Sequence, residues 1–322
     1  MTAPPDVLIV GAGVCGLTAG VRLAELGVRV RIRTERPPQE SSSAAAGAIW
    51  DPIQAAHPRV HLWSSRTYDE LVRMASSGGQ GVCVVDGVEA ARTPLAPPPW
   101  IERLPGFRRC TREELPPGFV VGWRYRAPLV DMPTYLRRLQ ERLLAAGGEL
   151  VAGRLEYLAE GFAEAPIVIN CTGAGARELA PDAALEPSRG QLVVVRNPGV
   201  REFFIEKTDD GEFAEVTYLL PQGDVLLLGG SAEPQNRQEP DLRVARGIVD
   251  RCAVVLPAVA AAEVLAHRVG IRPVRDEIRL DHIDHGDHHL IHNYGHGGSG
   301  VSVSWGCADD IADLVKGLLG RA

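Results

Sequence analysis

The chain has 322 residues, of which 45% are hydrophobic and 23% are charged, and its formal net charge is −7. This length is typical of two domains, and this composition is typical of a globular protein. An acidic balance without a long basic run argues against nucleic acid as a partner, because phosphates need a basic face. No apolar stretch reaches the roughly 20 residues of a membrane helix, and no secretory leader pattern is present. We therefore expect a cytoplasmic protein without a membrane partner.

The first predicted elements form a β-α-β unit. Residues 6–10 are short, β-branched and continuously apolar, which predicts a buried strand. Apolar residues at helical spacing predict a helix over 14–26, which Gly27 ends. A second strand is predicted over 28–32, and the small residues 41–46 predict a loop.

From about Trp50 to Val130 the pattern is irregular and rich in proline, which predicts the loops of a second lobe. A helix then follows Asp131 and stops at Gly147, with Pro133 in its first turn. Strands are predicted over 149–152 and 167–170, and an antiparallel sheet over 190–195, 218–220 and 225–228. A last strand, a glycine-rich turn and a helix to about residue 319 complete the chain.

This order predicts an α/β protein. One domain, of the Rossmann type, is expected from residues 1–50, 131–185 and 270–322. A second, mainly antiparallel-sheet domain is expected from residues 51–130 and 186–269.

Gly11, Gly13 and Gly16 form a G-x-G-x-x-G pattern between the first predicted strand and helix. The first glycine permits a tight turn, the second lets the backbone approach a pyrophosphate, and the third allows close packing of helix on strand. Glu35 follows the second predicted strand, where a carboxylate bonds the ribose of a bound adenosine. The alternative is a tight turn without ligand. The pattern alone does not separate FAD from NAD.

A second glycine-rich stretch lies near the C-terminus. Four glycines occur in the six residues from Gly295 to Gly300, directly before the last predicted helix. Backbone N–H groups at such a helix N-terminus suit the electron-rich pyrimidine edge of a flavin, which becomes anionic on reduction. The alternative is a turn that only caps the helix.

Histidines are concentrated just before this turn, and six of the nine lie between His282 and His296. The spacing of His282, His285 and His288 is that of a metal site. The alternative is a solvated hairpin loop between a strand that ends near Leu280 and one at residues 290–292. We favour the loop and predict no metal. The six cysteines are scattered without a C-x-x-C pair, which leaves at most an isolated disulfide open.

These pieces together resemble the D-amino acid oxidase family. The matching segments occur in the family's order over nearly the whole chain: residues 10–17, Trp50 with Pro52, 168–173, 189–191, 270–275, 292–298 and 305–308. The resemblance implies a Rossmann-type FAD-binding domain with a second, mainly antiparallel-sheet substrate domain, and FAD as the cofactor. It also implies oxidative deamination of D-amino acids to 2-oxo acids, ammonia and hydrogen peroxide, with molecular oxygen as acceptor.

The resemblance assigns roles to individual residues. Arg272 corresponds to the arginine that binds the substrate carboxylate, Tyr218 to a tyrosine that assists it, and the Gly298 carbonyl to the acceptor for the substrate amine. Residues implied to bind FAD are Gly11, Gly13, Val14, Gly16, Glu35, Arg36, Ser42, Ser43, Gly47, Leu155, Thr172, Gly297, Gly300, Val301 and Ser302. An arginine suits the first role independently, because its guanidinium binds a carboxylate through two parallel hydrogen bonds.

Two positions depart from the family pattern and are candidates for the substrate pocket. Asp51 stands where a glutamine is common; it would repel acidic side chains, favour cationic ones, or point away. In the lid between Lys207 and Tyr218 a second tyrosine is missing, and Phe213 or Ala214 falls near its place.

Our hypothesis for the reaction is direct hydride transfer from the substrate Cα to flavin N5, with orientation as the protein's contribution. The alternatives are a sibling flavin amine oxidase that acts on glycine, sarcosine or D-aspartate, an NAD-dependent dehydrogenase, and a non-catalytic flavin-binding protein. The sequence leaves a homodimer open.

Overall fold

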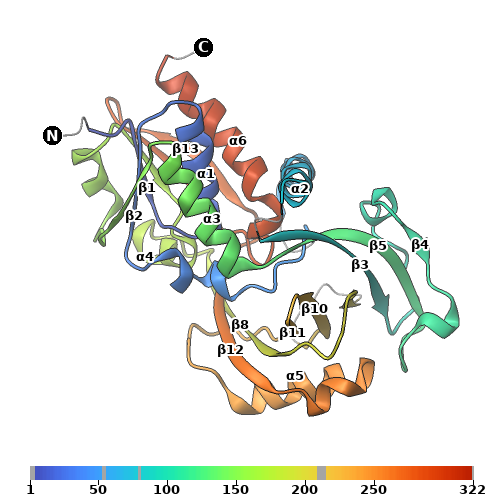
Figure 1. Ribbon diagram of the computed structural model, residues 1–322. Coiled ribbons are helices and arrows are strands. Elements are labelled where there is room, and N and C mark those ends of the chain that lie inside the picture. Colours follow the sequence, from blue (N-terminus) through green and yellow to red (C-terminus); the bar gives the residue numbers. More distant parts are fainter. Residues whose placement is uncertain (1–3, 53–55, 79–80, 209–214, 321–322) are drawn as a thin grey trace.

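The computed structural model describes residues 4–52, 56–78, 81–208 and 215–320. Its strands form a six-stranded and an eight-stranded sheet, and each sheet belongs to one lobe of the molecule (Figure 1). The expected α/β fold with two different sheets is confirmed.

The six-stranded sheet has the order β13-β14-β7-β1-β2-β6. Its strands are β1 (Val7–Val10), β2 (Val30–Thr34), β6 (Glu149–Ala152), β7 (Ile167–Asn170), β13 (Arg279–Asp284) and β14 (His289–Tyr294). All neighbours are parallel except the hairpin β13–β14. The predicted first β-α-β unit is confirmed, although β2 begins two residues later than expected. In such sheets, ligands bind at the carboxyl ends of the strands, at the place where the strand order reverses. Here that place lies between β1 and β7, because β2 is beside β1 on one side and β14 is beside β7 on the other.

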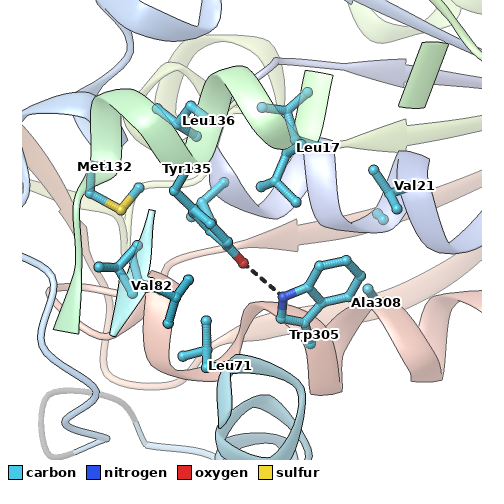
Figure 2. Close-up of a cluster of buried hydrophobic side chains, with 14 of the residues drawn as sticks. Leu17, Val21, Leu71, Val82, Met132, Tyr135, Leu136, Trp305 and Ala308 are labelled. Carbon is cyan, nitrogen blue, oxygen red and sulfur yellow. Dashed lines mark hydrogen bonds between the residues drawn. The ribbon is translucent and has the colours of Figure 1, made fainter. Parts of the chain in front are cut away.

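Three helices cover one face of this sheet: α1 (Val14–Glu25), α3 (Met132–Ala145) and α6 (Gly300–Leu318). Figure 2 shows the apolar contact between them, where the buried Trp305 indole donates a hydrogen bond to the Tyr135 hydroxyl (2.7 Å). The same cluster contains Leu17 from α1 and Leu71 from a further helix, α2 (Val60–Ser76). The short helix α4 (Ala176–Leu179) follows β7. Segments far apart in sequence thus share one core.

The eight-stranded sheet has the order β12-β8-β11-β10-β9-β3-β5-β4. Its strands are β3 (Val82–Ala91), β4 (Arg108–Arg109), β5 (Val121–Val130), β8 (Glu186–Arg196), β9 (Phe203–Lys207), β10 (Tyr218–Gln222), β11 (Val225–Gly229) and β12 (Val264–Val274). Only β3 and β9 pair in parallel, so the expected antiparallel character is confirmed. Helix α5 (Leu242–Val255) packs on β8 and β11.

Two expectations about local structure were wrong. The interval from about Trp50 to Val130 is not mainly loops, because it contains α2 and the long strands β3 and β5. Residues 41–46 do not form a plain loop but contain a 3₁₀ turn, Ser42–Ala45, which begins immediately after Ser41. The turn contacts β12, and the Ile271 N–H donates to the Ser42 hydroxyl (3.2 Å). These contacts explain why the segment has a regular conformation.

The proposed division of the chain into domains stays a prediction. Helix α2 lies within the segment 51–130 that we assigned to the substrate domain, but it packs on α6 beside the six-stranded sheet (Figure 1). All six cysteines are free thiols. Strands β13 and β14 form the expected hairpin, with His285 and His288 in its loop. The strands are longer than expected, because β13 continues past Leu280 to Asp284, and they include His282 and His289. In the described ranges, no three His, Cys, Asp or Glu side chains are grouped to hold a metal ion, and no helix is long and apolar enough to cross a membrane.

Candidate active site

A cavity of about 730 Å³ lies between the two sheets and connects the ends of β1, β2 and β7 with the inner face of the eight-stranded sheet. Its volume is that of a cofactor site rather than a small surface cleft. Glu35, Arg36 and Leu155 line one end, which we call the nucleotide end. Arg272 and Tyr218 line the other, which we call the substrate end.

The glycines of the first turn have the geometry that their pattern predicts. Gly11 has φ +104°, and a Cβ there would lie 2.6 Å from the Cys171 carbonyl oxygen. A Cβ at Gly16 would lie 1.9 Å from the Gly11 carbonyl oxygen, so only glycine lets α1 approach the turn this closely. Gly16 supports the turn from behind, whereas Gly11 and Gly13 line the cavity.

The N-terminus of α1 opens into the nucleotide end. Its N-cap is Gly13, and its first turn contains no acidic residue. The Val14 N–H donates to the Ser43 hydroxyl (3.0 Å), which brings the 3₁₀ turn over the helix end. A helix N-terminus with partial positive charge and a hydroxyl beside it suits the pyrophosphate of a dinucleotide.

The other predicted adenosine residues lie around the same end. Glu35 is exposed directly after β2, and its carboxylate is 3.8 Å from the Arg154 guanidinium. Arg36 donates to Gln238 (3.0 Å), and Leu155 is buried. Thr172 follows β7, and its hydroxyl donates to Asn170 (2.7 Å).

The second glycine turn forms the middle of the cavity wall. Gly297, with φ +54°, donates its N–H to the Pro273 carbonyl (2.8 Å), which ties the turn to β12. Gly297, Gly298, Gly300 and Val301 line the cavity at the N-terminus of α6. Ser302 is buried and does not line the cavity; its hydroxyl accepts the Asp51 N–H (2.9 Å). Ser302 therefore positions Asp51, which does line the cavity.

His296 lies inside this turn, and we assign it no acid–base role. It is buried, its Nε2 is 3.1 Å from the Asn293 side-chain oxygen, and burial lowers its pKa to about 4. The imidazole is therefore neutral at pH 7.

Arg272 extends from β12 across the inner face of the sheet. Its Nη1 donates to the Ser231 carbonyl (2.9 Å), and none of the ion pairs in the described ranges involves it. A Cβ at Gly190 would lie 2.4 Å from the same Nη1, so this glycine on β8 makes room for the guanidinium. Burial lowers the pKa of Arg272, an effect that the neighbouring Tyr218 opposes. An arginine remains charged, so the cavity contains a cation that is ready for an anion.

Tyr218 stands at the start of β10, as predicted, and its ring fills a slot made by glycines. A Cβ at Gly229 would lie 1.9 Å from the ring carbon that carries the hydroxyl, and one at Gly230 would lie 2.7 Å from the ring. Gly47 meets the ring from the opposite lobe, since its added Cβ would lie 3.4 Å away. The ring therefore has a fixed orientation beside Arg272. Phe213 and Ala214 lie outside the described residues.

Several cavity residues carried no signal in the sequence. Ile205 on β9, Val216 before β10, and Asn236 and Gln238 after β11 line the cavity only because distant strands are paired. Ala48 has φ +53°, which is rare for a residue other than glycine, and it also lines the cavity.

The residues present fit FAD at the nucleotide end and along the second glycine turn, and the comparisons with known proteins agree. Residues 6–314 match the family described as FAD dependent oxidoreductase. A D-amino-acid oxidase from Streptomyces coelicolor is 46% identical over 316 residues, which are 97% of each chain. One from Rubrobacter xylanophilus is 42% identical over 316 residues, 97% of this chain and 96% of that protein. The crystal structure of glycine oxidase from Geobacillus kaustophilus shares the fold, with a TM-score of 0.84 at 20% identity over 98% of this chain and 95% of that one.

Because the family matches almost the whole chain and two glycine turns converge on one cavity, this protein belongs to the FAD dependent oxidoreductases, and FAD is its cofactor.

Proposed function

We propose that the enzyme oxidatively deaminates D-amino acids to 2-oxo acids, ammonia and hydrogen peroxide. The observation that carries this proposal is Arg272, a half-buried guanidinium that lines the cavity without a carboxylate partner in the described part of the chain. A cation in such a cavity suits the one group that all amino acid substrates share, their carboxylate. The names of the two bacterial relatives support the same substrate class.

In this proposal the protein contributes orientation. Arg272 binds the substrate carboxylate, and the Tyr218 hydroxyl donates to the same group. The Gly298 carbonyl accepts a hydrogen bond from the amine. FAD, held along the two glycine turns, would supply the acceptor for the Cα hydrogen with its electron pair, and oxygen would be the final acceptor of the electrons. With the carboxylate and the amine both fixed, only one enantiomer directs its Cα–H towards the cofactor, and no general base is required of the chain.

The test is anaerobic addition of D-alanine or L-alanine to the purified holoenzyme. Bleaching of the yellow flavin absorbance by D-alanine alone is the expected result, followed by peroxide when air is admitted. Bleaching by L-alanine, or by neither, contradicts the proposal. Glycine, sarcosine and D-aspartate in the same assay separate the sibling amine oxidases.

We also propose a cytoplasmic location, and a homodimer remains open. Fractionation of cells and the mass of the purified holoenzyme in solution test them.

A further inference from the structure

A row of side chains continues the cavity wall into the interior of the eight-stranded sheet. Tyr218 on β10 is paired with Ile205 on β9, and Ile205 is paired with Glu89 on β3. Cross-strand partners project from the same face of a sheet. Tyr218 and Ile205 line the cavity, so Glu89 lies one strand beyond them on the same inner face.

Glu89 is deeply buried and only half bonded. Its side chain is 1% exposed, and its Oε2 accepts a hydrogen bond from the Tyr125 hydroxyl (2.7 Å). Among the residues that the structure describes, its Oε1 has no hydrogen-bond partner, and neither has the indole N–H of Trp123, the residue paired with Glu89 on β5. Buried polar atoms are nearly always bonded, so two partnerless atoms at facing positions need an explanation.

The charges around Glu89 indicate the kind of group that would satisfy it. Asp51, in the cavity wall, acts on Glu89 as a second negative charge. Burial and Asp51 raise the pKa of Glu89 to about 7, whereas Lys207 on β9 and the bond from Tyr125 act in the opposite direction. Lys207 forms no ion pair with Glu89 within the described ranges. A cation that arrived at this end of the cavity would relieve the repulsion between the two carboxyl groups.

We propose that Glu89 is a specificity-determining residue that favours D-amino acids whose side chain ends in a cation. With the substrate carboxylate at Arg272, a long side chain extends past Tyr218 and Ile205 towards Asp51 and the partnerless oxygen of Glu89. An acidic side chain would meet two carboxyl groups there and is disfavoured. This inference rests on the proposed function, because Arg272 has to hold the other end of the substrate.

D-lysine and D-norleucine test the inference, because their side chains have the same length of carbon chain and differ in the terminal ammonium. The holoenzyme should have a higher kcat/KM for D-lysine, and Glu89→Gln should lower the D-lysine to D-norleucine ratio at least about tenfold. The activity with D-alanine should stay within about twofold. Asp86→Asn, an exposed carboxylate on the same strand that pairs with Arg126 (2.9 Å), is the matched control and should change nothing. An unchanged ratio in Glu89→Gln, or an equal loss for all three substrates, overturns the inference.

The dependence on pH separates charge from packing. Since Glu89 ionises near neutrality, the preference for D-lysine should increase from about pH 6 to pH 8 in the wild type and stay flat in Glu89→Gln. The lysine ammonium remains charged throughout, and the α-amino group is common to both substrates, so it cancels in the ratio. A flat wild-type profile contradicts the inference.

Equilibrium binding gives a readout that does not depend on turnover. The probes are 6-aminohexanoate and hexanoate, which carry the carboxylate for Arg272 but have no α-amine to oxidise. Calorimetry should show tighter binding of 6-aminohexanoate to the wild type and to Asp86→Asn, and no preference in Glu89→Gln. If D-alanine bleaches the flavin while both probes bind equally, only the role of Glu89 is wrong. If no D-amino acid bleaches the flavin, the proposed function is wrong and the role of Glu89 falls with it.

Discussion

The two ends of the cavity are built in opposite ways. At the nucleotide end, the first glycine turn and the N-terminus of α1 supply glycines and backbone N–H groups from one short segment, and the ionisable side chains of Glu35 and Arg36 are exposed. At the substrate end, the buried or half-buried ionisable groups Arg272, Tyr218 and Glu89 come from three separate strands. Backbone dipoles bind a ligand at little cost in stability, whereas buried charged or partnerless groups cost free energy until a ligand satisfies them. The nucleotide end is therefore suited to hold a cofactor that stays bound, and the substrate end is suited to select among substrates that bind and leave.

Replacing Arg272 should give the largest effect and should spare the nucleotide end. Arg272→Ala removes the charge that we propose binds the substrate carboxylate, so we expect kcat/KM for D-alanine to fall about 10³-fold, or about 4 kcal/mol. Arg272→Lys keeps a charge but loses the forked geometry, so it should recover only part of the activity. The flavin content, measured alongside, should stay close to wild type. Near-normal kcat/KM in the alanine variant would end the assignment of Arg272.

Glu89→Gln should increase the free energy of unfolding, which would show that the buried carboxyl group at the substrate end destabilises the fold. The folded state raises the pKa of Glu89 from 4.5 to about 7, so it holds the proton more tightly than the unfolded chain does. Wild-type stability from this group is complete below about pH 4.5 and is lost as the pH rises through about 7. Above that pH the variant should be more stable by at most about 3 kcal/mol.

Urea unfolding of the holoenzyme between pH 5 and pH 8 measures this difference. The gain in Glu89→Gln should increase with pH over this range, while Asp86→Asn should show no such gain. A variant that loses stability at every pH would mean that Glu89 stabilises the fold.

Tyr218→Phe should have a smaller effect, also confined to the substrate end. The glycine slot around the ring admits phenylalanine without rearrangement, so only the hydroxyl is lost. A hydrogen bond to a charged group contributes about 2 kcal/mol, and we therefore expect kcat/KM to fall about thirtyfold. Tyr157→Phe, on an exposed tyrosine, is the control. Steady-state kinetics with D-alanine would refute the role of Tyr218 if both variants matched the wild type.

The same contrast explains what the sequence could predict. The turn from Gly11 to Gly16 depends on contacts within the β-α-β unit, and its local pattern of apolar residues and glycines was sufficient. Strand β3 was missed because Asp86 and Gly87 interrupt it with residues typical of a turn. Gly87 is in the strand because the Phe203 ring packs on it, and an added Cβ would lie 2.2 Å from that ring. Phe203 belongs to β9, so the residues around Gly87 in the sequence do not reveal this contact.

Helix α2 was missed for a similar reason. Its buried face includes Ser64 and Thr67 among apolar residues, which hides the helical period. Thr67 is buried because its hydroxyl accepts the Gly306 N–H of α6 (3.1 Å). At the substrate end, Arg272 and Tyr218 were found only through resemblance to a family. Glu89 belonged to no motif, and only the pairing of β3 with β9 places it near the cavity.

Ser43→Ala should give the smallest effect and should act only at the nucleotide end. The change removes the acceptor for the Val14 N–H at the start of α1, a loss comparable to that of a helix cap, about 1 kcal/mol. Because the hydroxyl lies beside the predicted pyrophosphate site, we expect the Kd for FAD to increase about fivefold, measured by titration of the apoprotein. With FAD in excess, kcat/KM for D-alanine should equal that of the wild type, since Arg272 and Tyr218 are untouched. Ser77→Ala, whose hydroxyl donates to the Arg73 carbonyl of α2, should leave both quantities unchanged. A Ser43→Ala variant with normal FAD affinity but altered substrate kinetics would show that the two ends are not independent.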